Sequence, residues 1–289
     1  MNNVVPRVAA IHDMSGFGRC ALTVIIPVMS TLGIQVCPLP TAIMSSHSGG
    51  FSNFSFVDLT DSMDKYMEHW ETLDLKFDGI YSGFLGSAQQ IDIVSRFIDH
   101  FDDGNTLVAV DPVMGDDGVL YKTYNLDMQN KMRHLVSKAH IITPNITEAA
   151  FLLEKEYENK PFKIETVKQM LKELSLMGPD TVVITGIIIE DTGYCNIGYS
   201  KKEEAIWLSK AESIPAHYPG TGDAYASVLI GNMIKGDSLA VSMAKATKFV
   251  YEAAKITYSF RTPEREGVLL EKVLPLLLNE EYASCERII

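Results

Sequence analysis

Short runs rich in β-branched residues alternate along this chain with longer stretches in which apolar residues recur at helical spacing. Bounded by Gly, Pro or Asp, such runs predict strands, here over residues 8–11, 35–38, 79–82, 107–111, 141–143 and 182–185. The intervening stretches predict helices, the clearest over residues 21–32, 88–100, 129–139, 164–177, 223–235 and 238–257. Strands that alternate with helices form a mostly parallel sheet with helices on both faces. The sequence therefore predicts a three-layer α/β/α fold.

Two segments depart from this alternation. Residues 194–199 and 205–208, joined by the polar sequence Ser-Lys-Lys-Glu-Glu, predict an antiparallel hairpin at one edge of the sheet. Residues 45–56 (SSHSGGFSNFSF) are small, polar and aromatic without a clear period, which predicts a loop or flap. No repeat, low-complexity segment or long linker occurs, so we expect a single domain over residues 1–289.

The charge of the chain restricts its partners. With 25 basic and 37 acidic residues, the formal charge is −12, a field that repels nucleic-acid backbones and anionic lipid surfaces. We therefore expect no nucleic-acid partner. An anionic ligand would have to be held locally, by backbone N–H groups, a helix N-terminus or a metal ion.

The cysteines and the N-terminal sequence indicate the compartment. Four widely separated cysteines form no CxxC pair, which argues against a zinc site or a disulfide framework. The first residues lack the features of a signal peptide, and no apolar run approaches the ~18 residues of a membrane span. We expect a cytoplasmic protein without membrane contact.

The strongest chemical signal is Gly220, Thr221, Gly222 and Asp223, directly before an apolar helical pattern. The two glycines allow a tight turn whose N–H groups can point at an anion, and the following helix adds its positive dipole end. The sequence thus predicts an anion hole with a carboxylate beside it. An ordinary helix N-cap with Asp as the capping residue is the alternative.

Two weaker signals also follow predicted strands. Asp111 and Asp116 lie at the exit of the strand over residues 107–111, where open α/β sheets place ligands, and their carboxylates could hold hydrated Mg²⁺. Asn145 and Glu148 follow the strand over residues 141–143, although they could simply cap the next helix. Together the three signals favour phosphoryl transfer, without a Walker motif or the motifs of protein kinases.

The order and spacing of these three motifs, GTGD, DPVMGD and TPNxxE, resemble those of the ribokinase-like kinases, in particular the branch of pyridoxal kinases and hydroxymethylpyrimidine kinases. The resemblance covers about residues 8–255. It implies ATP as phosphoryl donor, Mg²⁺ as cofactor and a homodimer as the assembly. It leaves open a monovalent cation near residues 220–223.

The resemblance also implies roles for individual residues. Asp223 would be the catalytic base, and the N–H groups of Gly220, Thr221 and Gly222 would form the anion hole. Asp111 and Glu148 would organise Mg²⁺. The other nucleotide-binding positions would be Asp116, Tyr121, Asn145 and Thr185, with Asp111 and Glu148.

Residues 81–87 (YSGFLGS) and 45–48 (SSHS) resemble the substrate segments of pyridoxal kinases, which implies a vitamin B6 vitamer as the alcohol substrate. The candidate substrate contacts are Asp13, Ser15, Met44, His47, Ser48 and Phe84. Four of them also have a plainer interpretation: Asp13 as a helix cap, His47 as an ordinary loop histidine, and Met44 and Phe84 as core residues.

Alternative functions remain at this point. The turn at residues 12–18 (HDMSGFG) is closer to hydroxymethylpyrimidine kinases of thiamine synthesis, whereas residues 40–45 lack the glutamine usual in those enzymes. The small-molecule partner is therefore a pyridine or a pyrimidine alcohol. A non-catalytic nucleotide-binding protein is a third alternative, which the presence of Asp223 and of the metal-organising acids disfavours.

Overall fold

The computed structural model describes residues 4–279 and 284–288. Six parallel strands form the centre of its main sheet: β1 (Arg7–Ser15), β2 (Gln35–Met44), β4 (Gly79–Ser82), β5 (Leu107–Val110), β8 (Ile141–Ile142) and β9 (Thr181–Ile189). They lie in the order β9-β8-β5-β4-β1-β2. All six predicted strands are confirmed.

Antiparallel strands extend the sheet on both sides. β10 (Gly193–Ser200) and β11 (Ala205–Lys210) form the predicted hairpin next to β9. The hairpin is not the outermost part of the sheet, because the short β12 (Glu286–Arg287) pairs outside β11. On the other side β3 (Phe56–Asp58) pairs with β2. A separate two-stranded hairpin comprises β6 (Gly115–Asp116) and β7 (Val119–Leu120).

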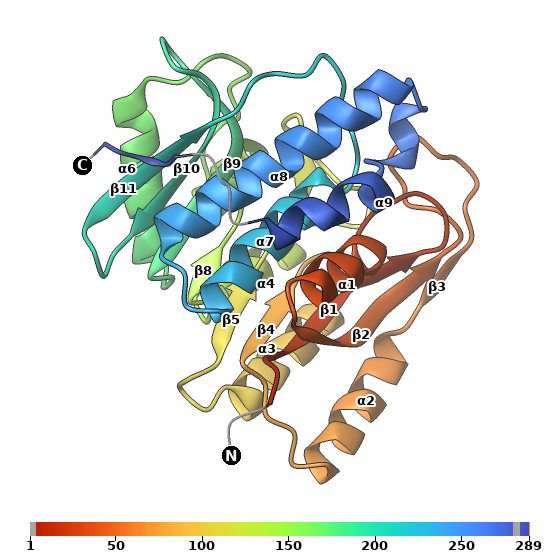
Figure 1. Ribbon diagram of the computed structural model, residues 1–289. Helices are drawn as coiled ribbons and strands as arrows, with labels where there is room; N and C mark the ends of the chain where they lie inside the picture. Colours follow the sequence, from red (N-terminus) through yellow and green to blue (C-terminus); the bar gives the residue numbers. More distant parts are fainter. Residues whose placement is uncertain (1–3, 280–283, 289) are drawn as a thin grey trace.

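Helices cover both faces of the sheet (Figure 1). One face carries α1 (Leu22–Thr31), α7 (Thr221–Ile234), α8 (Leu239–Phe260) and α9 (Leu270–Val273). The other carries α2 (Thr60–Thr72), α3 (Ala88–Phe101), α4 (Leu126–Val136), α5 (Ile146–Leu152) and α6 (Ile164–Leu176). Short 3-10 turns, η1 (Glu264–Glu266) and η2 (Leu274–Leu278), flank α9. The three-layer α/β/α fold is confirmed.

Each face of the sheet has its own apolar core, because successive side chains of a strand point to opposite faces. In β1, Val8 and Ala10 belong to the core beneath α1 and α7, whereas Ala9 and Ile11 belong to the core beneath α3. Among the described residues, no helix combines the length and the apolar character needed to cross a membrane.

Some elements differ from the predictions for identifiable reasons. Helix α2 was missed because only Thr60, Met63 and Met67 of its thirteen residues are buried, which leaves a weak apolar period. Strand β2 continues past Pro38 and Pro40, although proline cannot donate a hydrogen bond to a neighbouring strand. This is possible because residues 35–40 pair only with β1, while β3 pairs only with residues 42–44. Residues 45–55, between β2 and β3, form a loop as predicted.

Candidate active site

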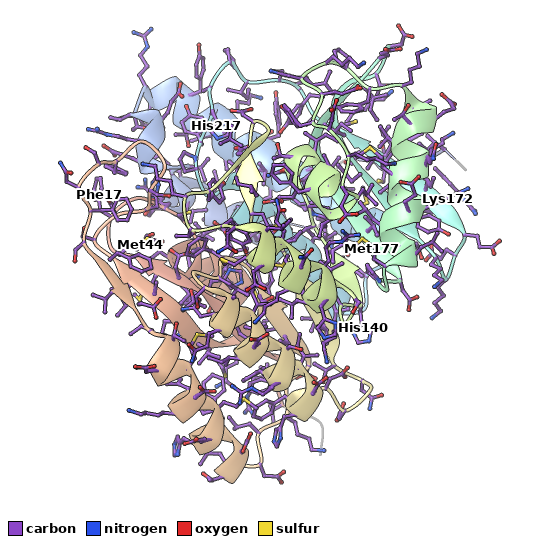
Figure 2. All side chains as sticks on the ribbon, turned by 180° about the vertical axis from the view of Figure 1, so that it is seen from behind. Phe17, Met44, His140, Lys172, Met177 and His217 are labelled. Carbon is purple, nitrogen blue, oxygen red and sulfur yellow. The ribbon has the colours of Figure 1, made fainter. Side chains whose placement is uncertain are left out.

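The candidate residues gather at the carboxyl ends of the parallel strands. Asp13 and Ser15 lie at the end of β1, Met44 ends β2, and Asp111 directly follows β5. Parallel strands all end on the same side of a sheet, which is where open α/β proteins bind ligands. In Figure 2, Phe17 and His217 lie toward this end of the molecule, and His140, directly before β8, lies farther toward the opposite end.

The turn before α7 has the geometry expected of an anion hole. Gly220 adopts the left-handed conformation, with φ of 80° and ψ of 0°, and ends the turn at the start of the helix. A Cβ atom at this position would lie 2.1 Å from the carbonyl oxygen of Arg19, so the backbone approach requires glycine. Around Gly222 a Cβ atom would meet nothing within 4 Å. The first N–H groups of a helix have no partner within it, so those of α7 are available to an anion at this turn.

Asp223 is held at this turn by one carboxylate oxygen. Oδ2 accepts a hydrogen bond of 2.8 Å from the backbone N–H of Ala21, and the thiol of Cys20 lies 3.5 Å from the same oxygen. Among the described residues none donates to Oδ1. The side chain does not cap α7, whose N-cap is Gly220 without a side-chain bond, so the capping alternative is wrong. Burial raises the pKa of Asp223, and the Ala21 N–H opposes that rise.

Asp111 and Glu148 form a buried acidic pair. Burial, followed by the charge of Asp223, raises the pKa of Asp111 to about 8. Burial, followed by the charge of Asp111, raises the pKa of Glu148. A bound cation would relieve the repulsion between these two buried carboxylates.

Glu148 also takes part in a capping box with Asn145. Its Oε2 accepts from the backbone N–H of Asn145 at 2.9 Å, and Oδ1 of Asn145 accepts from the N–H of Glu148 at 2.9 Å. Oε1 accepts from the N–H of Met114 at 3.2 Å. The capping interpretation of this motif is confirmed. Each oxygen of Glu148 keeps a second lone pair, so capping does not prevent contact with an ion or water.

The donor set at this site fits a magnesium ion. Two carboxylates offer hard oxygen ligands, and the buried hydroxyl groups of Tyr81 and Tyr124 have no hydrogen-bond partner in the described part of the chain. Such groups normally bind ordered water. No cluster of three or more His, Cys, Asp or Glu in the described part of the chain could hold a metal alone. The arrangement therefore suits a cation that keeps water and phosphate ligands.

The remaining nucleotide candidates surround this pair. Asp116 lies in the hairpin of β6 and β7, where the carbonyl of Gly115 accepts from the side chain of Asn145 at 3.0 Å. Thr185 pairs with Asn145 through an isolated parallel β-bridge of the backbone. Tyr121 follows β7 and is half-exposed. The structure thus brings these four positions together beyond the neighbouring ends of β5 and β8.

On the substrate side, Asp13 and Ser15 form a pair. The hydroxyl of Ser15 donates to Oδ2 of Asp13 at 3.2 Å, and both residues are buried. Burial, followed by the charge of Asp223, raises the pKa of Asp13 to about 7. Near neutral pH this carboxyl group can therefore donate a hydrogen bond to a ligand as well as accept one.

Both ring nitrogens of His47 form hydrogen bonds within the protein. Nδ1 accepts from the backbone N–H of Gly49 at 3.1 Å, and Nε2 lies 2.8 Å from the carbonyl oxygen of Arg265. Only the ring face is left for a ligand. Ser48 is exposed in the same loop, Met44 is buried at its base, and Phe84 is half-buried after β4.

Sequence reasoning missed Ala21 and Arg265 as parts of this site. Ala21 contributes only a backbone N–H, at φ of 51°, a conformation rare for a residue other than glycine. Arg265 lies on η1, beyond the last predicted helix. No motif identifies either residue, because their contacts depend on the backbone path rather than on residue type.

The chain matches known proteins over most of its length. A family model described as phosphomethylpyrimidine kinase matches residues 15–268. A protein of Bacteroides thetaiotaomicron VPI-5482, provisionally named a phosphomethylpyrimidine kinase and crystallised with pyridoxal, is 44% identical, with a TM-score of 0.94 over 98% of this chain and 100% of that one.

Two curated relatives carry different substrate names. A pyridoxal kinase of Arabidopsis thaliana is 29% identical over 233 residues, which are 75% of this chain and 73% of the relative. A hydroxymethylpyrimidine/phosphomethylpyrimidine kinase of Bacillus subtilis (strain 168) is 25% identical over 246 residues, which are 85% of this chain and 81% of the relative.

Proposed function

We propose that this chain, which belongs to the phosphomethylpyrimidine kinase family, uses ATP to phosphorylate the 5′-hydroxymethyl group of a vitamin B6 vitamer. The enzyme is a phosphotransferase with an alcohol acceptor. The observation that carries the proposal is the position of Asp223, whose Oδ1 has no partner among the described residues while Oδ2 is fixed beside the anion turn.

In the proposed reaction, Asp223 accepts the proton of the substrate hydroxyl as its oxygen attacks the terminal phosphorus of ATP. The bond to ADP breaks as the new phosphate ester forms. The N–H groups of Gly220, Thr221 and Gly222 stabilise the charge on the transferred group. Little covalent chemistry is required of the protein, because phosphoryl transfer depends mainly on positioning and charge neutralisation.

Asp111 and Glu148 would hold Mg²⁺, which when bound neutralises phosphate charge. Asp116, Tyr121, Asn145 and Thr185 would line the nucleotide phosphates. This assignment is supported by their common location beyond the neighbouring ends of β5 and β8 and by the absence of Lys and Arg from the set. Without a cation, the three carboxylates of Asp111, Asp116 and Glu148 would oppose the binding of a polyphosphate.

For the substrate, Asp13 and Ser15 would contact polar groups of the ring, and Met44 and Phe84 would form apolar walls. His47 and Ser48 would belong to the loop over the ring. The Bacteroides neighbour, 44% identical and bound to pyridoxal, supports a pyridine alcohol. The family description and the Bacillus relative favour hydroxymethylpyrimidine as the second candidate.

The deciding experiment is ATP turnover with Mg²⁺, measured in parallel on pyridoxal, pyridoxamine, pyridoxine and hydroxymethylpyrimidine. Phosphorylation of a B6 vitamer with the higher kcat/KM supports the proposal. Preference for the pyrimidine would replace it with the thiamine-synthesis function. Activity on none of the four would contradict both. Size measurement in solution would test the homodimer that we propose on the same resemblance.

A further inference from the structure

Three consecutive residues of η1 each contact a different loop of the candidate active site. The side chain of Glu264 accepts from the backbone N–H of His217, at 3.4 Å, in the loop before the anion turn. The carbonyl of Arg265 accepts from Nε2 of His47, at 2.8 Å, in the loop over residues 45–55. One short turn near the end of the chain thus connects two loops that flank the site.

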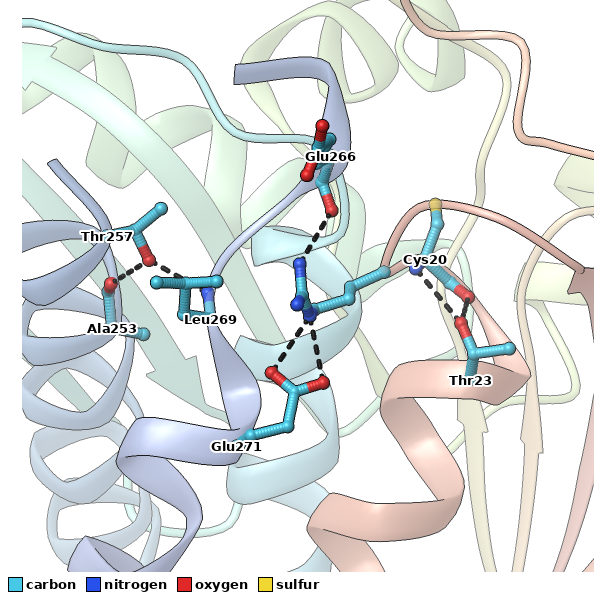
Figure 3. Close-up of polar contacts among 8 residues, drawn as sticks. Cys20, Thr23, Ala253, Thr257, Glu266, Leu269 and Glu271 are labelled. Carbon is cyan, nitrogen blue, oxygen red and sulfur yellow. Dashed lines mark hydrogen bonds and ion pairs between the residues drawn. The ribbon is translucent and has the colours of Figure 1, made fainter. Parts of the chain in front are cut away.

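The third contact reaches the loop between β1 and α1. The carbonyl of Glu266 accepts from the backbone N–H of Arg19 at 3.1 Å and from its guanidinium at 3.2 Å. The same guanidinium forms an ion pair with Glu271 at 3.1 Å. Figure 3 shows how Glu266 and Glu271 approach this group from two sides. Arg19 directly precedes the residues that hold Asp223, so η1 is joined to the catalytic end of the site as well.

The side chain of Arg265 makes a second connection to the loop over residues 45–55. Its guanidinium lies over the ring of Phe51, 5.0 Å from the centroid. The Phe51 ring in turn meets His47 edge-on at 5.0 Å and Phe17 at 5.7 Å. Gly50 packs so closely on Arg265 that an added Cβ atom would lie 3.0 Å from the Arg265 Cβ. These contacts hold the tip of a loop that has no regular structure of its own.

The two hydrogen bonds of His47 fix its tautomer. Because the N–H of Gly49 donates to Nδ1, that nitrogen carries no proton, and the proton of the neutral ring lies on Nε2. Nε2 can then donate to the carbonyl of Arg265. The His47 ring thus accepts one hydrogen bond from its own loop, at Gly49, and donates the other to η1, at Arg265.

We propose that Arg265 is a positioning residue that keeps the loop over residues 45–55 closed against the substrate side of the site, through Phe51 and through the bond from His47 to its carbonyl. The identity of the substrate rests on the proposed function, but the closure of the loop does not. Closed loops exclude water and hold the acceptor in place. Loss of closure should therefore raise KM for the alcohol substrate and leave kcat and KM for ATP nearly unchanged.

Loop opening can be measured without any substrate. Chymotrypsin cleaves after aromatic residues, and the loop contains Phe51 and Phe54. Arg265→Ala should speed cleavage in this loop about 2- to 5-fold, the size of effect expected from one cation–π contact at an exposed side chain. Arg265→Lys, which keeps the charge, should lie between wild type and Arg265→Ala. Lys272→Ala is the matched control, since Lys272 lies over Phe260 at 5.5 Å in the same C-terminal region.

A second pair of variants keeps the test independent of Arg265 itself. His47→Gln places an N–H donor where Nε2 lies and should retain slow cleavage. His47→Asn places an oxygen acceptor where Nδ1 lies, loses the bond to Arg265 and should be cleaved as fast as Arg265→Ala. Thermal unfolding establishes that each variant is folded.

The outcomes separate the two proposals. Unchanged cleavage in folded Arg265→Ala, or equal cleavage of the two His47 variants, would overturn the positioning role. Fast cleavage together with a raised KM for the alcohol and a constant kcat supports it. Failure of the wild-type enzyme on all B6 vitamers would contradict the proposed function, while the cleavage rates would still decide the role of Arg265.

Discussion

The backbone N–H of Ala21 donates a hydrogen bond of 2.8 Å to Oδ2 of Asp223. The two residues are 202 positions apart in the chain, and Ala21 adopts φ of 51° to make this contact. A positive φ costs on the order of 1–3 kcal/mol at a residue other than glycine. The fold thus accepts local strain to fix one oxygen of the proposed base, while the other has no partner among the described residues.

Replacement of Asp223 by Asn should lower kcat by about 10²- to 10⁴-fold, the contribution typical of a general base. The amide oxygen of Asn can still accept from Ala21, so the fold and ATP binding should change little. Turnover and calorimetric titration with ATP measure the two effects. Asp61→Asn, exposed on α2, is the control. A variant that keeps a tenth of the wild-type kcat would exclude Asp223 as the base.

The two glycines of the anion turn should respond differently to Ala. Gly220→Ala creates a contact of 2.1 Å with the carbonyl of Arg19 at a positive φ, so the protein should lose roughly 2 kcal/mol or more of stability. Gly222→Ala meets no protein atom within 4 Å and should keep its melting temperature while kcat/KM for ATP falls.

Chemical denaturation and ATP kinetics on both variants test this distinction. Equal losses of stability would show that the turn does not depend on the conformation of Gly220. Full activity of Gly222→Ala would place the transferred phosphate elsewhere.

The stability of the ligand-free protein should fall as the pH rises from about 4 to about 7. The pKa of Asp13 is raised to about 7 in the folded protein, whereas an unfolded Asp titrates near 4. Between these values the folded state binds more protons, so its stability is complete below the unfolded pKa and is lost through the folded one. Each unit corresponds to about 1.4 kcal/mol.

Urea unfolding at pH 5 and pH 8, in EDTA, measures this dependence. The stability of the Asp13→Asn variant should fall less between the two pH values, because Asn carries no titrating charge but can still accept a hydrogen bond from Ser15. Parallel declines of the variant and the wild type would show that Asp13 ionises normally.

Asp111→Asn should raise the Mg²⁺ concentration for half-maximal activity about 10-fold or more, since a lost carboxylate weakens binding of a hard cation. Activity at fixed ATP over a range of MgCl₂ concentrations measures the shift. Asp117→Asn is a close control, because Asp117 is exposed and its φ of 49° suits Asn. An unchanged Mg²⁺ requirement would remove Asp111 from the metal site.

The fold class and most of the candidate site could be predicted from the sequence. Strand and helix periods are local properties, so the six parallel strands and the edge-side hairpin could be predicted from short windows. Asp111 and Asn145 could be found because the carboxyl ends of parallel strands meet at one edge. The turn before α7 could be found because its two glycines directly precede a helical pattern. Their residue types then indicated phosphate and magnesium chemistry.

Tertiary structure alone decided how these groups are held. The bond from Ala21 to Asp223 spans 202 residues, and the contact of His47 with Arg265 spans 218. Both use backbone atoms, which every residue type except Pro can supply in full, so no sequence pattern encodes them. Whether Asp223 caps α7 or is held by the backbone N–H of Ala21 therefore depended on the path of the folded chain.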